Sequence, residues 1–162
     1  MTRARRDTAA ARLSALGLTL PTPPAPLAAY VPAVQTGDLL FVSGLLPLRD
    51  GVMMHPGALG GGVSVEEGAA AARQAMLNGL AVIERAAGSL ERVRRIVRLN
   101  GFVASTPGFT TQPAVVNGAS ELLAAVFGEA GRHSRVAVGV AALPLNAPIE
   151  LDLVVQLLRP RR

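Results

Sequence analysis

Two apolar segments near the C-terminus, 135–141 and 149–157, constrain the fold most strongly. Val, Leu, Ile and Ala fill most of their positions, and a stretch containing Pro144 and Pro148 joins them. Their composition is typical of strands, and the apolar residues are not confined to alternate positions. A sheet built from such strands needs cover on both faces. We therefore expect helices on one face and another subunit on the other.

The rest of the chain interleaves strands with helices. Apolar patterning predicts strands over 31–35, 39–44 and 96–104, and helices over 65–87 and 113–127. Ser64 and Glu67 have the spacing of a capping box at the start of the first helix, and Gly88 follows its end. The predicted order is β-β-α-β-α-β-β. This order is typical of an α+β protein with one mixed sheet and two helices packed on one face.

We divide the 162 residues into one domain with two appendages. Residues 28–158 form the predicted domain, and residues 159–162 form a basic tail. Residues 1–27 are an N-terminal extension, with a short helix over 8–16 and an extended Pro-rich stretch over 21–26. A Gly-rich segment over 50–63 is predicted to be a loop, because it lacks the spacing of a phosphate-binding motif.

The residue types that are missing from the chain exclude several kinds of catalytic chemistry. The chain has no Cys and no Lys, since all 16 basic residues are Arg. Disulfides, thiolate nucleophiles and a lysine Schiff base are therefore excluded. The two histidines, His55 and His133, lie far apart without ligand spacing, so we predict neither a metal nor a cofactor.

Hydropathy and charge indicate whether the chain contacts a membrane or a nucleic acid. No apolar run reaches the ~20 residues that span a bilayer, and no secretory signal is recognisable, so we predict a cytoplasmic protein without membrane contact. The net charge is +5, but seven of the 16 arginines lie in residues 1–12 and 159–162. Four Phe and one Tyr offer little surface for base stacking. These features argue against a nucleic-acid partner.

Arg135 and Glu150 are charged residues in the two apolar C-terminal segments. A guanidinium at the mouth of an apolar strand is costly to bury unless it meets an anion. Arg binds carboxylates through two parallel hydrogen bonds, so the pair suggests a pocket for a small acid. The alternative is that Arg135 and Glu150 form only a salt bridge at an interface.

Two groups of motifs resemble the RidA family, also called the YjgF/YER057c/UK114 family. Tyr30, Gly37-Asp38 and Val42-Ser43-Gly44 resemble its N-terminal signature. Arg135-Val136-Ala137-Val138, Leu143-Pro144 and Ile149-Glu150-Leu151 resemble its C-terminal signature. The resemblance covers about residues 28–157, and the order and spacing of the pieces make it specific.

The resemblance implies a chorismate mutase-like fold and a homotrimer with clefts between subunits. It also implies hydrolysis of reactive 2-imino or enamine acids, such as 2-aminoacrylate or 2-iminobutanoate, to the 2-keto acid and ammonia. Arg135 matches the family's carboxylate-binding residue, and Glu150 matches its water-positioning residue. The expected substrate-binding residues are Tyr30, Gly44, Asn117 and Ala137.

The chain also departs from the family pattern. Leu45 follows Ser43-Gly44 where Gln is common, and His133-Ser134 precedes Arg135 where Pro-Ala is frequent. These changes indicate a divergent subgroup and leave open whether His133 tunes the pocket or lies in a surface turn. Two other functions stay open as well. One is a non-catalytic protein that binds a small keto or amino acid, and the other is an endoribonuclease or translation inhibitor.

Overall fold

A five-stranded mixed sheet organises the molecule. The computed structural model describes residues 8–23 and 29–159. The strands lie in the order β1-β2-β7-β5-β6. β5 and β6 are parallel, and the other neighbouring pairs are antiparallel. The strands are β1 (Ala33–Thr36), β2 (Leu39–Leu45), β5 (Val93–Ala104), β6 (Ser134–Val140) and β7 (Ile149–Leu157).

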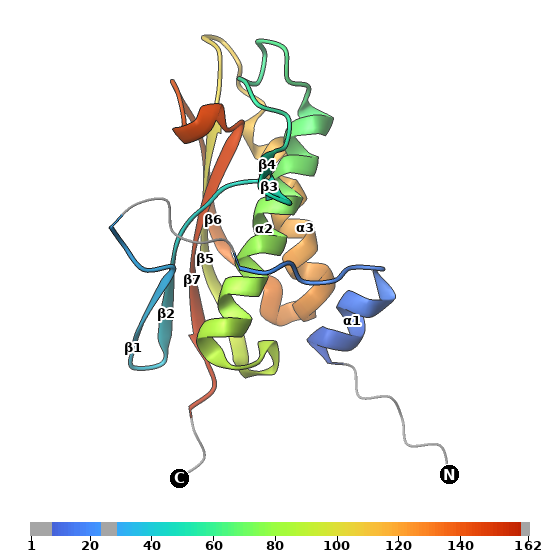
Figure 1. Cartoon of the computed structure of the whole chain (residues 1–162), viewed down its shortest axis with the longest axis vertical. Helices are drawn as coiled ribbons and strands as arrows, with labels where there is room; N and C mark the ends of the chain where they lie inside the picture. The colour runs from blue at the N-terminus through green and yellow to red at the C-terminus, as the bar shows by residue number, and fades with distance from the viewer. Residues whose placement is uncertain (1–7, 24–28, 160–162) are drawn as a thin grey trace.

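Helices cover one face of this sheet, as predicted. α2 (Val65–Ala87) and α3 (Gln112–Phe127) pack against each other and against the strands (Figure 1). The capping box of α2 is formed, because Ser64 Oγ accepts from the Glu67 backbone N–H and Glu67 Oε2 accepts from the Ser64 backbone N–H. Gly88 ends α2 in the left-handed conformation. The predicted α+β class and the placement of these two helices are confirmed.

The N-terminal segment contributes a third helix. α1 (Ala9–Ala15) begins after Thr8, whose hydroxyl oxygen accepts a hydrogen bond from the Ala11 backbone N–H. Leu13 is buried in the main core, and α1 packs against α3. Part of the Pro-rich stretch predicted over 21–26 lies outside the described residues, since 24–28 are not described.

Two local features differ from the sequence prediction. The expected loop over 50–63 starts inside a small hairpin, β3 (Leu48–Arg49) and β4 (Val52–Met53), which turns through Asp50 and Gly51 at positive φ. β5 begins at Val93, three residues before the start of the strand predicted over 96–104. Register shifts interrupt the pairing of β5 with β7 in this region, and they break the alternation that would have marked the strand.

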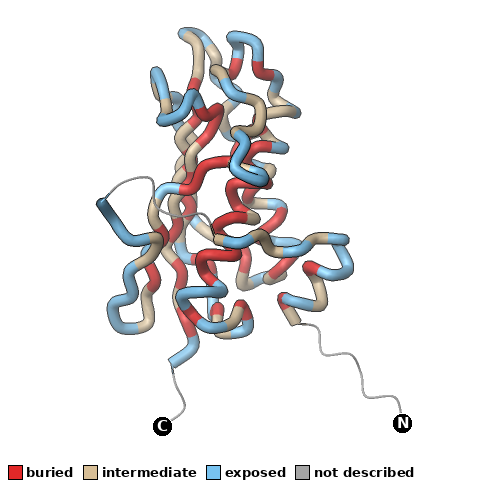
Figure 2. Tube along the Cα trace, viewed as in Figure 1, coloured by how far each residue is buried: buried red, intermediate tan, exposed pale blue. Residues whose placement is uncertain are grey.

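Short 3₁₀ helices complete the connections. They are η1 (Leu90–Arg92), η2 (Gly128–Gly131) and η3 (Pro144–Asn146). The buried core lies between the sheet and the helices (Figure 2). Its fully buried large side chains include Leu40, Leu80, Leu99, Leu122, Leu123, Leu151 and Leu153.

Apolar side chains also occupy the other, helix-free face of the sheet, which we call the open face. Phe41 is paired with Val34 on β1 and with Val154 on β7, and Phe102 is paired with Val138 on β6. Phe41 and Val138 are 44% and 43% exposed, which is high for strand residues of this size. Charged and polar residues lie among them, so the open face is mixed rather than uniformly apolar.

Candidate functional site

Arg135 lies on β6, an edge strand of the sheet, and its side chain points toward α3. Nη1 donates a hydrogen bond to Ser120 Oγ at 2.9 Å, and Nη2 donates to the Pro113 carbonyl oxygen at 3.2 Å. The guanidinium is half-buried beside an open cavity of about 430 Å³, which Ser120 and His133 also line. Arg135 is therefore held by neutral acceptors, and its charge is available to an anionic ligand.

Asn117 and Ala137 lie near Arg135. Asn117 is four residues after Pro113 and three before Ser120 on α3, so helical geometry places it on the same side of the helix as both. Ala137 follows Arg135 by two residues on β6 and therefore lies on the same face of the sheet. Three predicted site residues, Arg135, Asn117 and Ala137, thus form one group at the β6–α3 edge.

Glu150 and Gly44 form a second group. A Cβ atom at Gly44 would overlap the Glu150 carboxylate, so the absence of a side chain lets the carboxylate lie against β2. Glu150 has no hydrogen-bond or ion-pair partner among the described residues. Burial raises the pKa of the Glu150 carboxyl, and the neighbouring charge of Asp152 adds to the effect.

Tyr30 belongs with this second group by its position in the chain. It precedes Val31, whose carbonyl oxygen accepts a hydrogen bond from Ser43 Oγ at 2.6 Å. The Pro32 carbonyl oxygen accepts from the Ser43 backbone N–H at 2.9 Å. These bonds fix the segment after Tyr30 beside Ser43, which is the neighbour of Gly44. The Tyr30 side chain is 44% exposed.

The sheet separates the two groups within one chain. Arg135 is in register with Leu99, a buried residue on the helix-covered face. Glu150 is in register with Phe102, three residues further along β5 and therefore on the open face. β5 also lies between β6 and β7. The shared pocket suggested by the sequence is consequently not formed inside a single subunit.

Ser120 is a residue of this region that the sequence did not reveal. It accepts a hydrogen bond from Arg135 and contacts His133 Nε2 at 3.0 Å. The available signal was its helical spacing from Asn117, which lies one turn earlier on α3. The register that brings α3 against Arg135 cannot be read from that spacing.

The described residues contain no group of three or more His, Asp or Glu side chains placed to bind a metal ion. None of the described helices is both long enough and apolar enough to cross a membrane.

The mixed sheet with its helices on one face places the protein in the class of small α+β proteins. The family model described as "YjgF/chorismate mutase-like, putative endoribonuclease" matches residues 10–157. This chain belongs to that family, which is the RidA family indicated by the sequence motifs.

Individual relatives agree with this assignment. The chain is 49% identical over 149 residues to the Trypanosoma cruzi protein named "Protein TCP17", covering 91% of this chain and 93% of the relative. It is 46% identical to an Agrobacterium tumefaciens protein of unknown function, whose crystal structure superposes with a TM-score of 0.87 over 93% of each chain. It is 29% identical to a Dermatophagoides farinae protein named 2-iminobutanoate/2-iminopropanoate deaminase, over 85% of this chain and 93% of the relative.

Proposed function

We propose that this protein is a cytoplasmic hydrolase that deaminates reactive 2-imino or enamine acids to the 2-keto acid and ammonia. Family membership and the name of the Dermatophagoides farinae relative support this reaction class. The observation that carries the proposal is the pair of complementary residue groups. One group presents the Arg135 guanidinium, and the other presents a Glu150 carboxylate without a hydrogen-bond or ion-pair partner in the part of the chain that the structure describes.

The two groups suit the two ends of such a substrate. Arg135 holds the carboxylate through its guanidinium N–H groups. Glu150 accepts a proton from a water molecule as the water oxygen attacks the carbon of the C=N bond, and this proton passes to the imine nitrogen to form the carbinolamine. The carbinolamine hydroxyl then gives its proton, through Glu150, to the nitrogen. The C–N bond breaks to release ammonia, and the C–O bond becomes the C=O bond of the ketone. The reaction needs only water as a second reactant, and correct positioning supplies much of its rate.

A second copy of the chain completes the site in this proposal. Arg135 and Glu150 lie on opposite faces of one sheet, so an interface must bring Arg135 of one subunit to the open face of the next. Such an interface joins two different surfaces of identical chains, and repetition of this contact closes a ring. The apolar residues on the open face supply a surface for burial. We therefore propose a homotrimer with the site at each subunit interface.

The test follows the decay of 2-aminoacrylate and 2-iminobutanoate, generated in situ by a pyridoxal-dependent dehydratase. We expect the wild type to accelerate decay and Arg135→Ala to lose at least ~100-fold in kcat/KM, since a charged hydrogen-bonding partner is removed. Arg94→Ala is the matched control, because Arg94 is an exposed arginine on β5. An equal loss in both variants would argue against a specific role for Arg135.

The same decay assay, combined with a titration of the wild type with a 2-keto acid, separates the non-catalytic alternative from the enzyme. A wild type that binds a 2-keto acid but does not accelerate imine decay would be a binding protein of this fold. A wild type that neither binds nor accelerates would contradict the proposed ligand class.

A further inference from the structure

Ser120 lies at the centre of a short chain of hydrogen bonds that joins His133 to Arg135. Ser120 Oγ accepts from Arg135 Nη1 at 2.9 Å and lies 3.0 Å from His133 Nε2. His133 Nδ1 is 2.6 Å from the Gly131 carbonyl oxygen. All three side chains are half-buried and line the same cavity of about 430 Å³. Three elements, α3, β6 and the segment after η2, meet at this point.

When the His133 imidazole is neutral, these contacts determine which ring nitrogen carries a hydrogen and where the Ser120 hydroxyl hydrogen points. A carbonyl oxygen can only accept, so Nδ1 of His133 carries the hydrogen that is donated to Gly131. Nε2 is then unprotonated and accepts the hydroxyl hydrogen of Ser120. The hydroxyl has no second hydrogen to offer to the cavity, and its oxygen remains the acceptor for Arg135.

Protonation of His133 reverses one of these bonds. Both ring nitrogens then donate, so Nε2 donates to Ser120 Oγ and the Ser120 hydroxyl hydrogen must turn elsewhere. Arg135 and His133 then both donate to Ser120 Oγ, so the hydroxyl hydrogen is released from His133 and can point into the cavity that Ser120 lines. The cavity would then present a hydroxyl donor beside the guanidinium, together with an additional positive charge.

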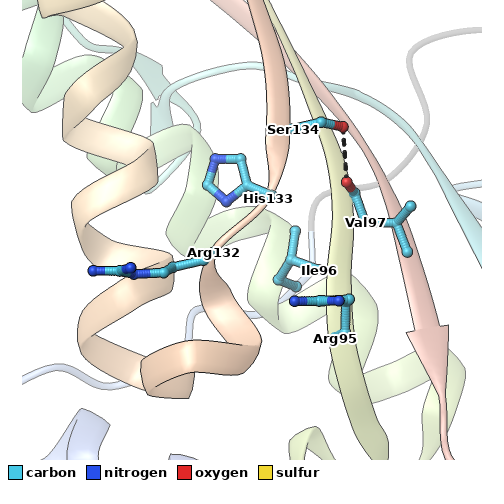
Figure 3. A pocket seen from close by; sticks show the side chains of 6 residues that line it. All are labelled: Arg95, Ile96, Val97, Arg132, His133 and Ser134. Atoms are coloured by element: carbon cyan, nitrogen blue, oxygen red, sulfur yellow. Dashed lines mark hydrogen bonds between the residues drawn. The ribbon is translucent and has the colours of Figure 1, made fainter.

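The orientation of His133 is fixed by the start of β6. Figure 3 shows the His133 ring pointing toward α3, whereas the next side chain, Ser134, points the other way toward Val97 of β5. Ser134 Oγ donates to the Val97 carbonyl oxygen at 3.0 Å. The backbone is thus anchored on one side while His133 reaches Ser120 on the other. The charged side chains that line cavities together with His133 are Glu121 on α3, Arg95 on β5, and Arg132 and Arg135 beside it. Glu129 on η2 forms an ion pair with Arg132.

We propose that His133 and Ser120 are positioning residues that set the affinity of the Arg135 site for a carboxylate ligand through the direction of the Ser120 hydroxyl. The inference rests on the proposed role of Arg135 in binding a carboxylate. Carboxylate affinity rises when His133 becomes protonated, because the ligand gains a hydroxyl donor next to the guanidinium. It falls when the imidazole is neutral and takes up the only hydroxyl hydrogen of Ser120.

The binding test measures the affinity of the assembled protein for 2-oxobutanoate by titration calorimetry between about pH 5 and about pH 8. We expect about tenfold tighter binding at the acid end for the wild type, the contribution of one hydrogen bond to a charged group. Ser120→Ala and His133→Gln remove this pH dependence, whereas Ser120→Thr retains it. Ser14→Ala, at an exposed position on α1, is the matched control and behaves as the wild type. The same pH dependence in Ser120→Ala or His133→Gln would overturn the proposal.

A second measurement does not depend on the ligand. Side-chain N–H signals of Arg135 in nitrogen-15 NMR spectra report its hydrogen bonding, and the imidazole signals report the titration of His133. The proposal predicts that the Arg135 signals shift with the His133 titration in the wild type but not in Ser120→Ala. Arg135 signals that do not follow His133 in the wild type overturn it. If the coupling is present but 2-oxobutanoate does not bind, the proposed ligand class fails and the positioning chain stands.

Discussion

At the scale of single residues, the ionisation of Glu150 links the site to stability. Burial, and then the charge of Asp152, raise the pKa of this carboxyl in the folded protein. A carboxyl with a raised pKa contributes stability that is present at acid pH and lost as the pH rises through its folded-state pKa. At neutral pH the ionised Glu150 therefore destabilises the fold relative to a neutral side chain.

Glu150→Gln should consequently unfold at a higher urea concentration than the wild type at neutral pH. The difference should shrink as the pH falls below the raised pKa, because the wild-type carboxyl becomes neutral as well. Glu84→Gln, at an exposed position on α2, is the control for loss of one negative charge. A Glu150→Gln variant less stable than the wild type at neutral pH would contradict this account.

The sequence identified Arg135 and Glu150 as charges within apolar strands, and the structure places both on strands. It did not show that they face opposite ways. That relation depends on β5, which precedes both segments in the chain but lies between β6 and β7 in the sheet. Strand order and register are set by contacts between distant segments, so local patterning carries little information about them.

At the scale of elements, the contact between α2 and α3 depends on Gly118. A Cβ atom at this position would overlap the Ala69 carbonyl oxygen of α2, a backbone atom that cannot move independently of its helix. Gly118 thus allows the two helices to approach closely over the core. Overpacking of such a contact typically costs about 1–3 kcal/mol.

Gly118→Val should lower the free energy of unfolding by at least about 2 kcal/mol, measured by urea denaturation. Ala125→Val adds side-chain volume at an exposed position of the same helix and should cost less than about 1 kcal/mol. Equal effects of the two substitutions would indicate that helix propensity, rather than the contact with Ala69, governs the loss.

Elements with strong local sequence signals were predicted correctly, whereas elements with weak or disturbed signals were missed. The bounds of α2 were predicted from a capping box, an apolar stripe and a terminal glycine, which all act within the helix. The start of β5 was missed because bulges disturb its alternation, and Arg94 and Arg95 are both exposed there. The β3–β4 hairpin was missed because two-residue strands are too short to show any period.

At the scale of the whole molecule, the open face is the candidate surface for contact between subunits. Phe41 lies on β2 beside Val34 and Val154, where it is 44% exposed in a single chain. If this face is the subunit interface, a charge at this position would be buried without a partner.

Phe41→Asp should therefore convert the assembly to monomers in light scattering and abolish imine deamination, while the circular dichroism spectrum stays folded. Val52→Asp is the matched control, because Val52 is 69% exposed on β4, outside the five-stranded sheet. It should remain oligomeric and active. A Phe41→Asp variant with an unchanged mass would place the interface elsewhere.

In the proposed assembly, Arg135 of one subunit works with Glu150 of another. The most direct measurement mixes two inactive variants, Arg135→Ala and Glu150→Gln, under conditions in which subunits exchange, and follows 2-iminobutanoate decay. Random mixing of equal amounts gives clefts with both native residues in about a quarter of cases, so we predict about a quarter of the wild-type activity. Mixed assemblies that form but stay inactive would show that the two residues do not act across the interface.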